Sequence, residues 1–217
     1  MRNITYGMLA AIAVLALMEA MTRVAASFDE SVRKAVHFAA SPALTAFFKS
    51  ETWLGSWIVL LPVCIVAALW QKRIILMLAA YAGAAALTEA AKVIVQRPRP
   101  LPYFNVSPET WSFPSGHSLE SAAVYWTLAA VIAASASLPG RRVVVYSLAV
   151  LPVITGLSRI YLGMHYPTDV IAGWAAGGCW SAGMVRALAA GSVRRVGCKN
   201  APDLDIAFVK RVDDAER

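Results

Sequence analysis

Two polar segments of this 217-residue chain hold two of its three histidines. In the second, residues 158–169, His165 precedes Asp169 by four residues and Pro167 suits the first turn of a helix. A carboxylate at that spacing can accept the Nδ1 proton of the histidine and leave Nε2 free as a nucleophile. The alternative is an ordinary His/Asp pair at the protein surface.

The first polar segment, residues 113–117 (FPSGH), directly precedes a long apolar stretch. Ser115 is a candidate N-cap, and Gly116 lets a ligand approach the backbone without a side chain in the way. The unpaired N–H groups and the positive dipole end of a helix start suit a phosphate. An ordinary cap explains the serine equally well, but His117, an ionisable group at the end of an apolar helix, favours a functional site.

A third polar group begins at Lys92 and continues through the sequence RPRP at residues 97–100. The prolines cannot continue a helix, so we expect an extended segment whose two arginines, Arg97 and Arg99, have different targets. Lys92 should lie near these arginines, where it could bind an anion. The alternative is a lysine that reaches the membrane interface and pairs with Glu89.

The elements that must position these residues are membrane helices. Hydrophobic residues make up 59% of the chain, charged residues only 15%, and the mean hydropathy is +0.58. This composition argues against an ordinary soluble domain and indicates an integral membrane protein. Apolar stretches of roughly 20 residues predict an all-α bundle of six transmembrane helices within residues 1–190. The expected spans are residues 4–22, 53–70, 74–95, 119–138, 143–162 and 170–190.

Three segments lie at or outside the limits of these spans. The first apolar stretch could also be a cleavable signal, but Glu19 and Met21 stand where the cleavage region would be. Residues 28–50 repeat apolar and charged side chains at helical spacing, which is typical of a helix at the membrane interface, and Ser41-Pro42 should end that helix. Residues 191–217 have mixed charge and are expected to form a cytoplasmic tail.

Charge predicts the orientation. Most basic residues outside the polar segments fall on one side of the six-span arrangement, which the positive-inside rule makes cytoplasmic together with both termini. These are Arg2, Lys72, Arg73, Arg141, Arg142, Arg194, Arg195 and Lys199. The cations of the polar segments oppose the rule and therefore need an anionic ligand. The net charge of +7 is thus divided between topology and anion binding, and no nucleic-acid partner is expected.

The spacing of the three groups resembles the three-part signature of the type 2 phosphatidic acid phosphatase superfamily. Its parts are Lys92 with Arg99-Pro100, then PSGH at residues 114–117, then Ser158-Arg159 with His165 and Asp169. By motif the resemblance covers residues 92–190. It places the phosphate-binding arginine at Arg99, so Arg97 is expected to matter much less.

The resemblance implies a role for each matching residue. His165 would attack phosphorus and form a phosphohistidine, with Asp169 orienting it, and His117 would act as general acid and then as general base. The phosphoryl oxygens would be held by Lys92, Arg99, Arg159 and the backbone around Ser115 and Gly116. The scheme needs no metal or other cofactor. Cys64, Cys179 and Cys198 likewise show no disulfide or zinc-ligand spacing.

The substrate follows less directly from the sequence. Six spans and a short chain resemble the bacterial inner-membrane lipid phosphatases of this superfamily, whose site would face the periplasm. Among their substrates we favour undecaprenyl pyrophosphate. Phosphatidylglycerophosphate, phosphatidate, the phosphates of lipid A and transfer to a second lipid remain alternatives. Soluble acid phosphatases and vanadium haloperoxidases share the motifs, but the apolar spans argue against both. A non-catalytic transporter or scaffold would not need these residues in register.

Two further features stay open at this stage. Glu120, one turn after His117, could tune that histidine, touch the substrate headgroup or simply form a hydrogen bond inside the bundle. The glycines of the last span allow close helix contact within the bundle or between subunits, and we expect contact within the bundle. These are Gly173, Gly177 and Gly178. The sequence does not predict an oligomeric state.

Overall fold

The computed structural model describes residues 2–70, 73–104, 110–134 and 139–196. All the regular secondary structure in this part of the chain is helical. The α-helices are α1 (Arg2–Val24), α2 (Ala26–Phe38), α3 (Pro42–Glu51), α4 (Trp57–Trp70), α5 (Ile74–Val95), α6 (Gly116–Ala134), α7 (Arg141–Tyr161) and α8 (Pro167–Val196). A 3-10 turn, η1 (Thr52–Gly55), precedes α4. Residues 105–109, the end of the expected span 119–138 and the tail beyond residue 196 lie outside the described residues.

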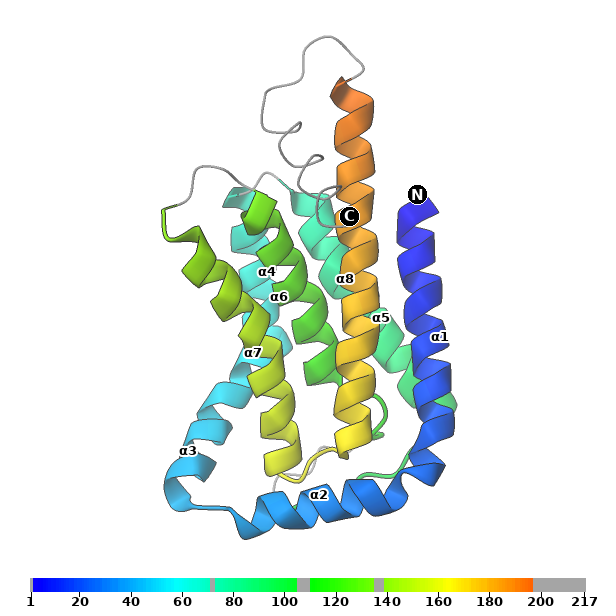
Figure 1. Ribbon diagram of the computed structural model, residues 1–217, viewed down its shortest axis with the longest axis vertical. Coiled ribbons are helices and arrows are strands. Elements are labelled where there is room, and N and C mark those ends of the chain that lie inside the picture. The colour runs from blue at the N-terminus through cyan, green and yellow to red at the C-terminus, as the bar shows by residue number, and fades with distance from the viewer. Residues whose placement is uncertain (1, 71–72, 105–109, 135–138, 197–217) are drawn as a thin grey trace.

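The long helices α1, α5, α6, α7 and α8 run along the long axis of the molecule, and α2 lies across one end of them (Figure 1). This crossing helix covers the first part, residues 28–38, of the segment 28–50 in which the sequence predicted an interfacial helix. The chain breaks at Ser41-Pro42 as expected, and the Ser41 hydroxyl then caps α3 by accepting from the amide of Leu44 at 3.3 Å.

Within the residues that the structure describes, three helical segments are long and apolar enough to cross a membrane: Arg2–Thr22, Ile75–Val95 and Arg141–Tyr161. A fourth span is possible if α3 and η1 (Pro42–Gly55) join α4 across a bend of 49°. The expected span over residues 53–70 is therefore interrupted near its start, because η1 takes up its first residues and α4 begins only at Trp57. Ser56 separates η1 from α4. Its backbone is extended, so η1 ends there and a new helix begins at Trp57.

Helices α6 and α8, which the sequence predicted as spans, are not among these segments, and many of their side chains are buried within the bundle. Glycines bring these two helices together. A Cβ at Gly173 would lie 2.8 Å from the carbonyl oxygen of Ser115, and one at Gly177 would lie 2.5 Å from that of Leu119. Contact within the bundle, as expected for these glycines, is confirmed, and it places the start of α6 beside the start of α8.

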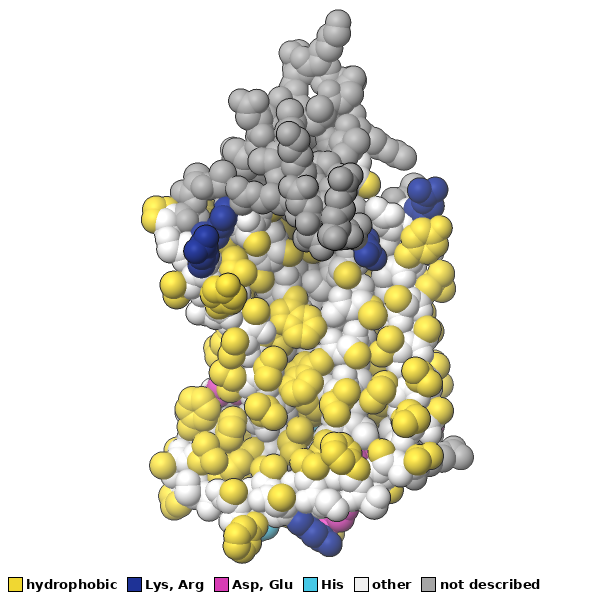
Figure 2. All heavy atoms as spheres, in the orientation of Figure 1, with side chains coloured by type: hydrophobic (Ala, Val, Ile, Leu, Met, Phe, Trp, Pro, Cys, Tyr) yellow, Lys and Arg dark blue, Asp and Glu magenta, His cyan; other side chains and the backbone are white. Residues whose placement is uncertain are grey.

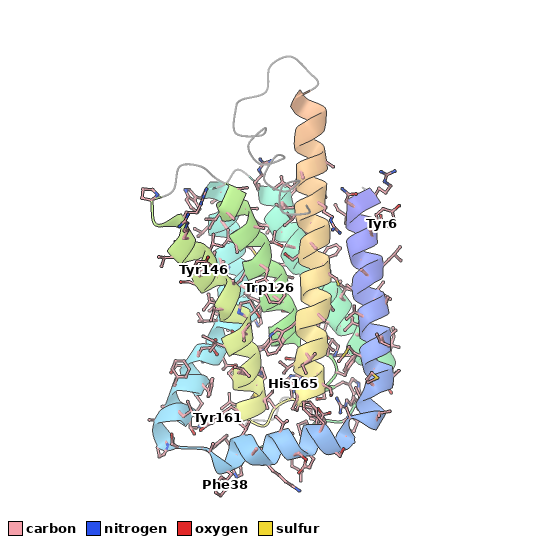
Figure 3. The ribbon with its side chains drawn as sticks, viewed as in Figure 1. Tyr6, Phe38, Trp126, Tyr146, Tyr161 and His165 are labelled. Carbon is pink, nitrogen blue, oxygen red and sulfur yellow. The ribbon has the colours of Figure 1, made fainter. Side chains whose placement is uncertain are left out.

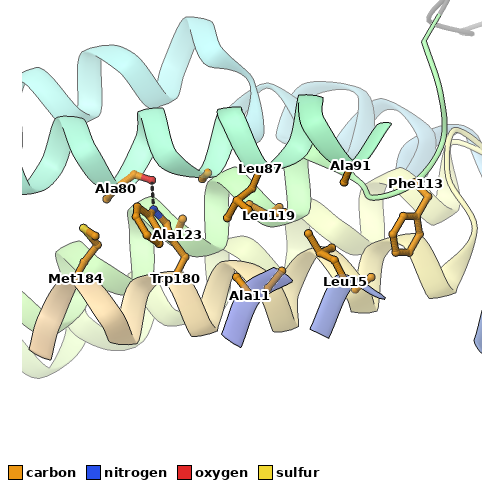
Figure 4. Close-up of a cluster of buried hydrophobic side chains, with 13 residues drawn as sticks. Ala11, Leu15, Ala80, Leu87, Ala91, Phe113, Leu119, Ala123, Trp180 and Met184 are labelled. Carbon is orange, nitrogen blue, oxygen red and sulfur yellow. Dashed lines mark hydrogen bonds between the residues drawn. The ribbon is translucent and has the colours of Figure 1, made fainter. Parts of the chain in front are cut away.

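Helix α1 packs on α8 in the same way. A Cβ on Gly7 would lie 2.7 Å from the Cα of Gly183, so neither position has room for a larger side chain. Figure 4 shows the buried cluster that α1, α5, α6 and α8 share, in which the indole of Trp180 donates to the carbonyl of Ala80 at 3.0 Å. This bond satisfies the N–H of a buried indole, which would otherwise lack a partner in an apolar cluster.

The surface agrees with a membrane location. Hydrophobic side chains cover the middle of the face shown in Figure 2. Arg2 and Arg141 begin α1 and α7, and Arg73 precedes α5, so all three lie at the end of the bundle opposite α2 (Figure 1). Three of the basic residues that the sequence assigned to one side of the membrane, Arg2, Arg73 and Arg141, are thus at one end of the molecule.

Candidate active site

The three polar segments meet at the end of the bundle that α2 covers. His165, labelled in Figure 3, lies in the turn between α7 and α8, near α2. His117 is in the first turn of α6, Lys92 is in the last turn of α5, and Arg99 is in the extended segment after α5. Each residue therefore stands at or just beyond a helix end, where a rigid bundle can hold it.

His165 and Asp169 form the centre of this site. The imidazole is 2% exposed and the carboxylate is fully buried. Nδ1 of His165 lies 3.5 Å from Oδ2 of Asp169, and Nδ1 has no other partner among the described residues. The spacing of four residues thus brings the pair together, at a distance that a small movement would shorten to a hydrogen bond.

Arg99 approaches the other ring nitrogen. Its Nη1 lies 3.0 Å from Nε2 of His165 and also donates to the carbonyl of Met164 at 2.7 Å. Nε and Nη2 donate to the carbonyl and the hydroxyl of Thr110. Because a guanidinium can only donate, Nε2 must accept here, so the proton of a neutral imidazole is assigned to Nδ1, on the side of Asp169.

The surroundings also fix the protonation state of His165. Burial, opposed by Asp169 and reinforced by Arg99, lowers the pKa of this imidazole from 6.5 to about 4. Burial likewise lowers the pKa of Arg99, although Asp169 opposes the change. His165 is therefore neutral at ordinary pH and presents an unprotonated nitrogen.

Asp169 is held by more than the histidine. Its Oδ2 accepts from the hydroxyl of Ser112 and from the amide of Tyr166, and its Oδ1 accepts from Nη1 of Arg97. The second nitrogen of Arg97 donates to the buried Asp29 of α2 at 2.8 Å. The expectation that Arg97 is peripheral is therefore not supported, because this arginine contacts the carboxylate that faces His165.

Neither Asp29 nor Ser112 was predicted as a site residue. Asp29 comes from a helix 140 positions away in the sequence from Asp169, so no local spacing relates them. In the sequence Asp29 is one of several charged residues of an amphipathic segment. Its burial, at 1% exposure, is seen only in the structure.

A second arginine enters the site from α7. Arg159 is 5% exposed, its Nη1 donates to the hydroxyl of Thr52 at 2.9 Å, and its Nε has no partner among the described residues. The positive charge of Arg159 helps to lower the pKa of His165, so Arg159 and His165 lie close enough to interact. Among the described residues, neither Arg99 nor Arg159 forms an ion pair with a carboxylate. A buried and a half-buried cation next to a neutral histidine fit an anionic ligand.

The start of α6 contributes the remaining residues. A Cβ on Gly116 would lie 3.2 Å from Oε1 of Glu120 and 3.9 Å from Nζ of Lys92, so both side chains reach the first turn of α6. Lys92 also pairs with Glu89 at 2.9 Å, as the sequence allowed. On the other side of this turn, the ring of His117 lies against η1, since a Cβ on Gly55 would come within 3.1 Å of it.

Ser115 differs from its expected role. Its amide donates to the carbonyl of Asp169 at 3.1 Å, and its hydroxyl is buried and accepts from Ser118. The Ser115 amide is therefore not free to hold a phosphate. It ties the start of α6 to the start of α8, while the amides of Gly116 and His117, in the first turn of α6, need partners from outside the helix.

No group of three His, Cys, Asp or Glu side chains in the described part of the chain is arranged to hold a metal ion. Cys64 and Cys179 are free thiols. The chemistry that this arrangement offers is that of a neutral histidine nucleophile, a second histidine and a set of cations around an anion.

Known proteins resemble both the sequence and the fold. The family model of the PAP2 superfamily matches residues 73–191. Phosphatidylglycerophosphatase B of Bacillus subtilis is 33% identical over 164 residues, which cover 72% of this chain and 81% of that protein. The undecaprenyl-diphosphatase of Sulfolobus acidocaldarius is 25% identical over 146 residues, covering 64% of this chain and 67% of that protein.

Two crystal structures superpose on the fold. The transmembrane PAP2-type phosphatidylglycerolphosphate phosphatase from Bacillus subtilis has a TM-score of 0.75 and 26% identity, with 90% of this chain and 100% of that chain covered. LpxE of Aquifex aeolicus has a TM-score of 0.60 and 26% identity, with 72% and 93% covered.

Proposed function

The chain belongs to the PAP2 superfamily, and the relatives described above are lipid phosphatases. On that premise we propose that it hydrolyses a membrane-lipid phosphate through a phosphohistidine intermediate. The observation that carries the proposal is the arrangement around His165. Its Nε2 is an acceptor, its Nδ1 faces a buried carboxylate, and the Arg99 guanidinium beside it has no carboxylate partner among the described residues.

In the first step Nε2 of His165 attacks phosphorus, forming the N–P bond as the bond to the lipid oxygen breaks. The Nδ1 proton stays on the imidazole, and Asp169 stabilises the positive charge that develops there. Burial and the neighbouring cations hold the pKa of His117 well below 6.5 in the free site, so this imidazole takes up a proton as the anionic phosphate binds. His117 then gives that proton to the departing oxygen, so the lipid leaves as an alcohol, or as a lipid phosphate if the substrate is a pyrophosphate. Substrate phosphate replaces His165 as the partner of Arg99 Nη1.

In the second step water hydrolyses the phosphohistidine. His117, now deprotonated, takes a proton from a water molecule, whose oxygen attacks phosphorus while the N–P bond breaks. Inorganic phosphate leaves and Nε2 of His165 recovers its lone pair. Lys92, Arg99, Arg159 and the amides of Gly116 and His117 hold the equatorial oxygens in both steps, where charge shifts most in the transition state.

For the substrate, the relatives favour a different lipid from the one that the sequence suggested. Phosphatidylglycerophosphate becomes our first candidate, because the relative at 33% identity and the structure with a TM-score of 0.75 both carry that activity in their names. Undecaprenyl pyrophosphate, the expectation from sequence, is the second candidate and is supported by the named activity of the Sulfolobus relative.

We further propose a bacterial inner-membrane location with the active site at the periplasmic face and both termini in the cytoplasm. The support is the cluster of arginines at the end of the bundle opposite the site. A phosphate at the α2 end of the molecule could then be reached by a lipid whose chains remain in the bilayer.

The test is phosphate release by the purified protein in one detergent. We would compare phosphatidylglycerophosphate, undecaprenyl pyrophosphate, phosphatidate and lipid A, with His165→Ala as the inactive control. Release from at least one lipid by the wild type and none by His165→Ala is expected. Equal release by both proteins, or no release from any of the lipids, would refute the enzymatic proposal. Labelled phosphate that appears in a second lipid instead of in solution would indicate transfer.

A further inference from the structure

Asp29 is a buried carboxylate on α2 that the phosphohistidine mechanism does not use. Its side chain is 1% exposed, although α2 lies at the surface across the end of the bundle (Figure 1). A charge in that position must have partners to compensate its lost hydration. All the partners of Asp29 that the structure gives belong to the elements that carry the site.

The first partner is the start of α8. Oδ1 of Asp29 accepts from the amide of Thr168 at 2.9 Å, and Oδ2 accepts from the hydroxyl of the same residue at 2.7 Å. The amide of Thr168 is one of the N–H groups that the first turn of a helix leaves unpaired. Asp29 therefore caps α8 from another helix, one residue before Asp169.

The second partner is Arg97, which lies between two carboxylates. Its Nη2 donates to Asp29 at 2.8 Å, and its Nη1 donates to Asp169 and to the Thr168 hydroxyl. Packing alone does not fix this guanidinium, because Arg97 lines a cavity of about 440 Å³. Glu19, Asp29, Glu30 and Tyr166 line the same cavity.

We propose that Asp29 is a positioning residue for the phosphatase reaction: it holds Arg97 and the first turn of α8 so that Asp169 faces Nδ1 of His165. The inference rests on the proposed function. Without the Asp29 carboxylate, both nitrogens of Arg97 become available to Asp169. The resulting two-point ion pair draws that carboxylate away from a histidine already 3.5 Å distant.

The neighbouring Glu30 provides a matched control on the same helix. It pairs with Arg33 at 2.9 Å and with Lys34 at 3.6 Å, both on α2 itself, and its side chain is 45% exposed. Replacing Glu30 by Gln removes one negative charge, as replacing Asp29 by Asn does, at the adjacent position of the same helix.

The experiment compares steady-state kinetics of Asp29→Asn, Glu30→Gln and wild type on a lipid that the wild type hydrolyses. Asp29→Asn should lower kcat by about 10- to 100-fold and leave KM within about threefold, because a displaced orienting group slows the step without removing a phosphate contact. Glu30→Gln should stay within about twofold of wild type. Asp29→Glu, which keeps the charge, should recover part of the loss and serves if Asp29→Asn does not fold.

A second background separates positioning from general stability. If Asp29 acts through Arg97, Asp29→Asn should change kcat less than about twofold in a protein that already carries Arg97→Met. The inference is overturned if Asp29→Asn matches wild type, if it raises KM with kcat unchanged, or if it costs the same factor in both backgrounds. A wild type that releases no phosphate from any lipid would instead refute the proposed function, so the two failures are distinguishable.

Discussion

Nη1 of Arg99 lies 3.0 Å from Nε2 of His165, and this contact assigns the tautomer of the nucleophile. An arginine that donates to Nε2 leaves the imidazole proton on Nδ1, where Asp169 lies. The same arginine is a natural partner for the phosphate that His165 would attack. Without substrate, Nε2 of His165 therefore contacts the guanidinium of Arg99, the same cation that is expected to bind the phosphate.

Asp169→Asn should slow phosphate release by about 10²- to 10⁴-fold while KM changes little. An amide can donate toward Nδ1 and then favours the tautomer with its proton on Nε2, which removes the nucleophilic lone pair. Single-turnover kinetics measure this directly. A variant with wild-type kcat would show that Asp169 only supports the fold.

Arg99→Ala and Arg97→Ala should both be severe but should differ in kinetic pattern. Arg99 is expected to hold substrate phosphate, so its loss should raise KM and lower kcat, by about 10²-fold or more in kcat/KM. Arg97 contacts Asp169 and Asp29 instead, so its loss should act mainly on kcat. A raised KM in Arg97→Ala with unchanged kcat would place Arg97 on the substrate.

The sequence could predict what depends on local spacing. The i, i+4 spacing of His165 and Asp169 brings the pair together, and the prolines of residues 97–100 keep that segment out of helix, as expected. Helix α5 begins and ends at the predicted residues, 74 and 95. Each of these features depends on residues that are neighbours in the chain.

What the sequence could not predict depends on contacts between distant elements. The role of Arg97 depends on Asp29, which reaches it from a separate helix. The amide of Ser115 looked free for phosphate, but Asp169 takes it once α6 packs on α8. The break at Ser56 was also missed, because the apolar run from Trp53 continues across it without a proline or a charge.

Glu120→Gln should strengthen phosphate binding and lower KM by about twofold to fivefold. Glu120 and Lys92 both reach the first turn of α6, beside Gly116, so a carboxylate there weakens the positive potential that attracts the substrate. The measurement is KM for the hydrolysed lipid together with the inhibition constant of inorganic phosphate. If both constants and the pH–rate profile match wild type, Glu120 is structural.

Gly7→Val should destabilise the bundle by about 1–3 kcal/mol, because its added Cβ would lie 2.7 Å from the Cα of Gly183 and would separate α1 from α8. Ala13→Val, at an exposed position of the same helix, is the control. Thermal unfolding in detergent should give a lower Tm for Gly7→Val alone. Equal Tm values would mean that the α1–α8 contact contributes little to stability.

Acid should destabilise the folded protein through His165. The pKa of this imidazole is lowered by burial from 6.5 to about 4, so between these pH values the unfolded chain binds a proton that the folded protein does not. More protons on the unfolded state mean that stability is fully present above pH 6.5 and falls as the pH drops toward 4. Tm measured from pH 7.5 downward should therefore fall on the order of 5–10 °C more for the wild type than for His165→Asn, which has no group that titrates there. Parallel curves for the two proteins would contradict the assignment of a neutral, buried histidine.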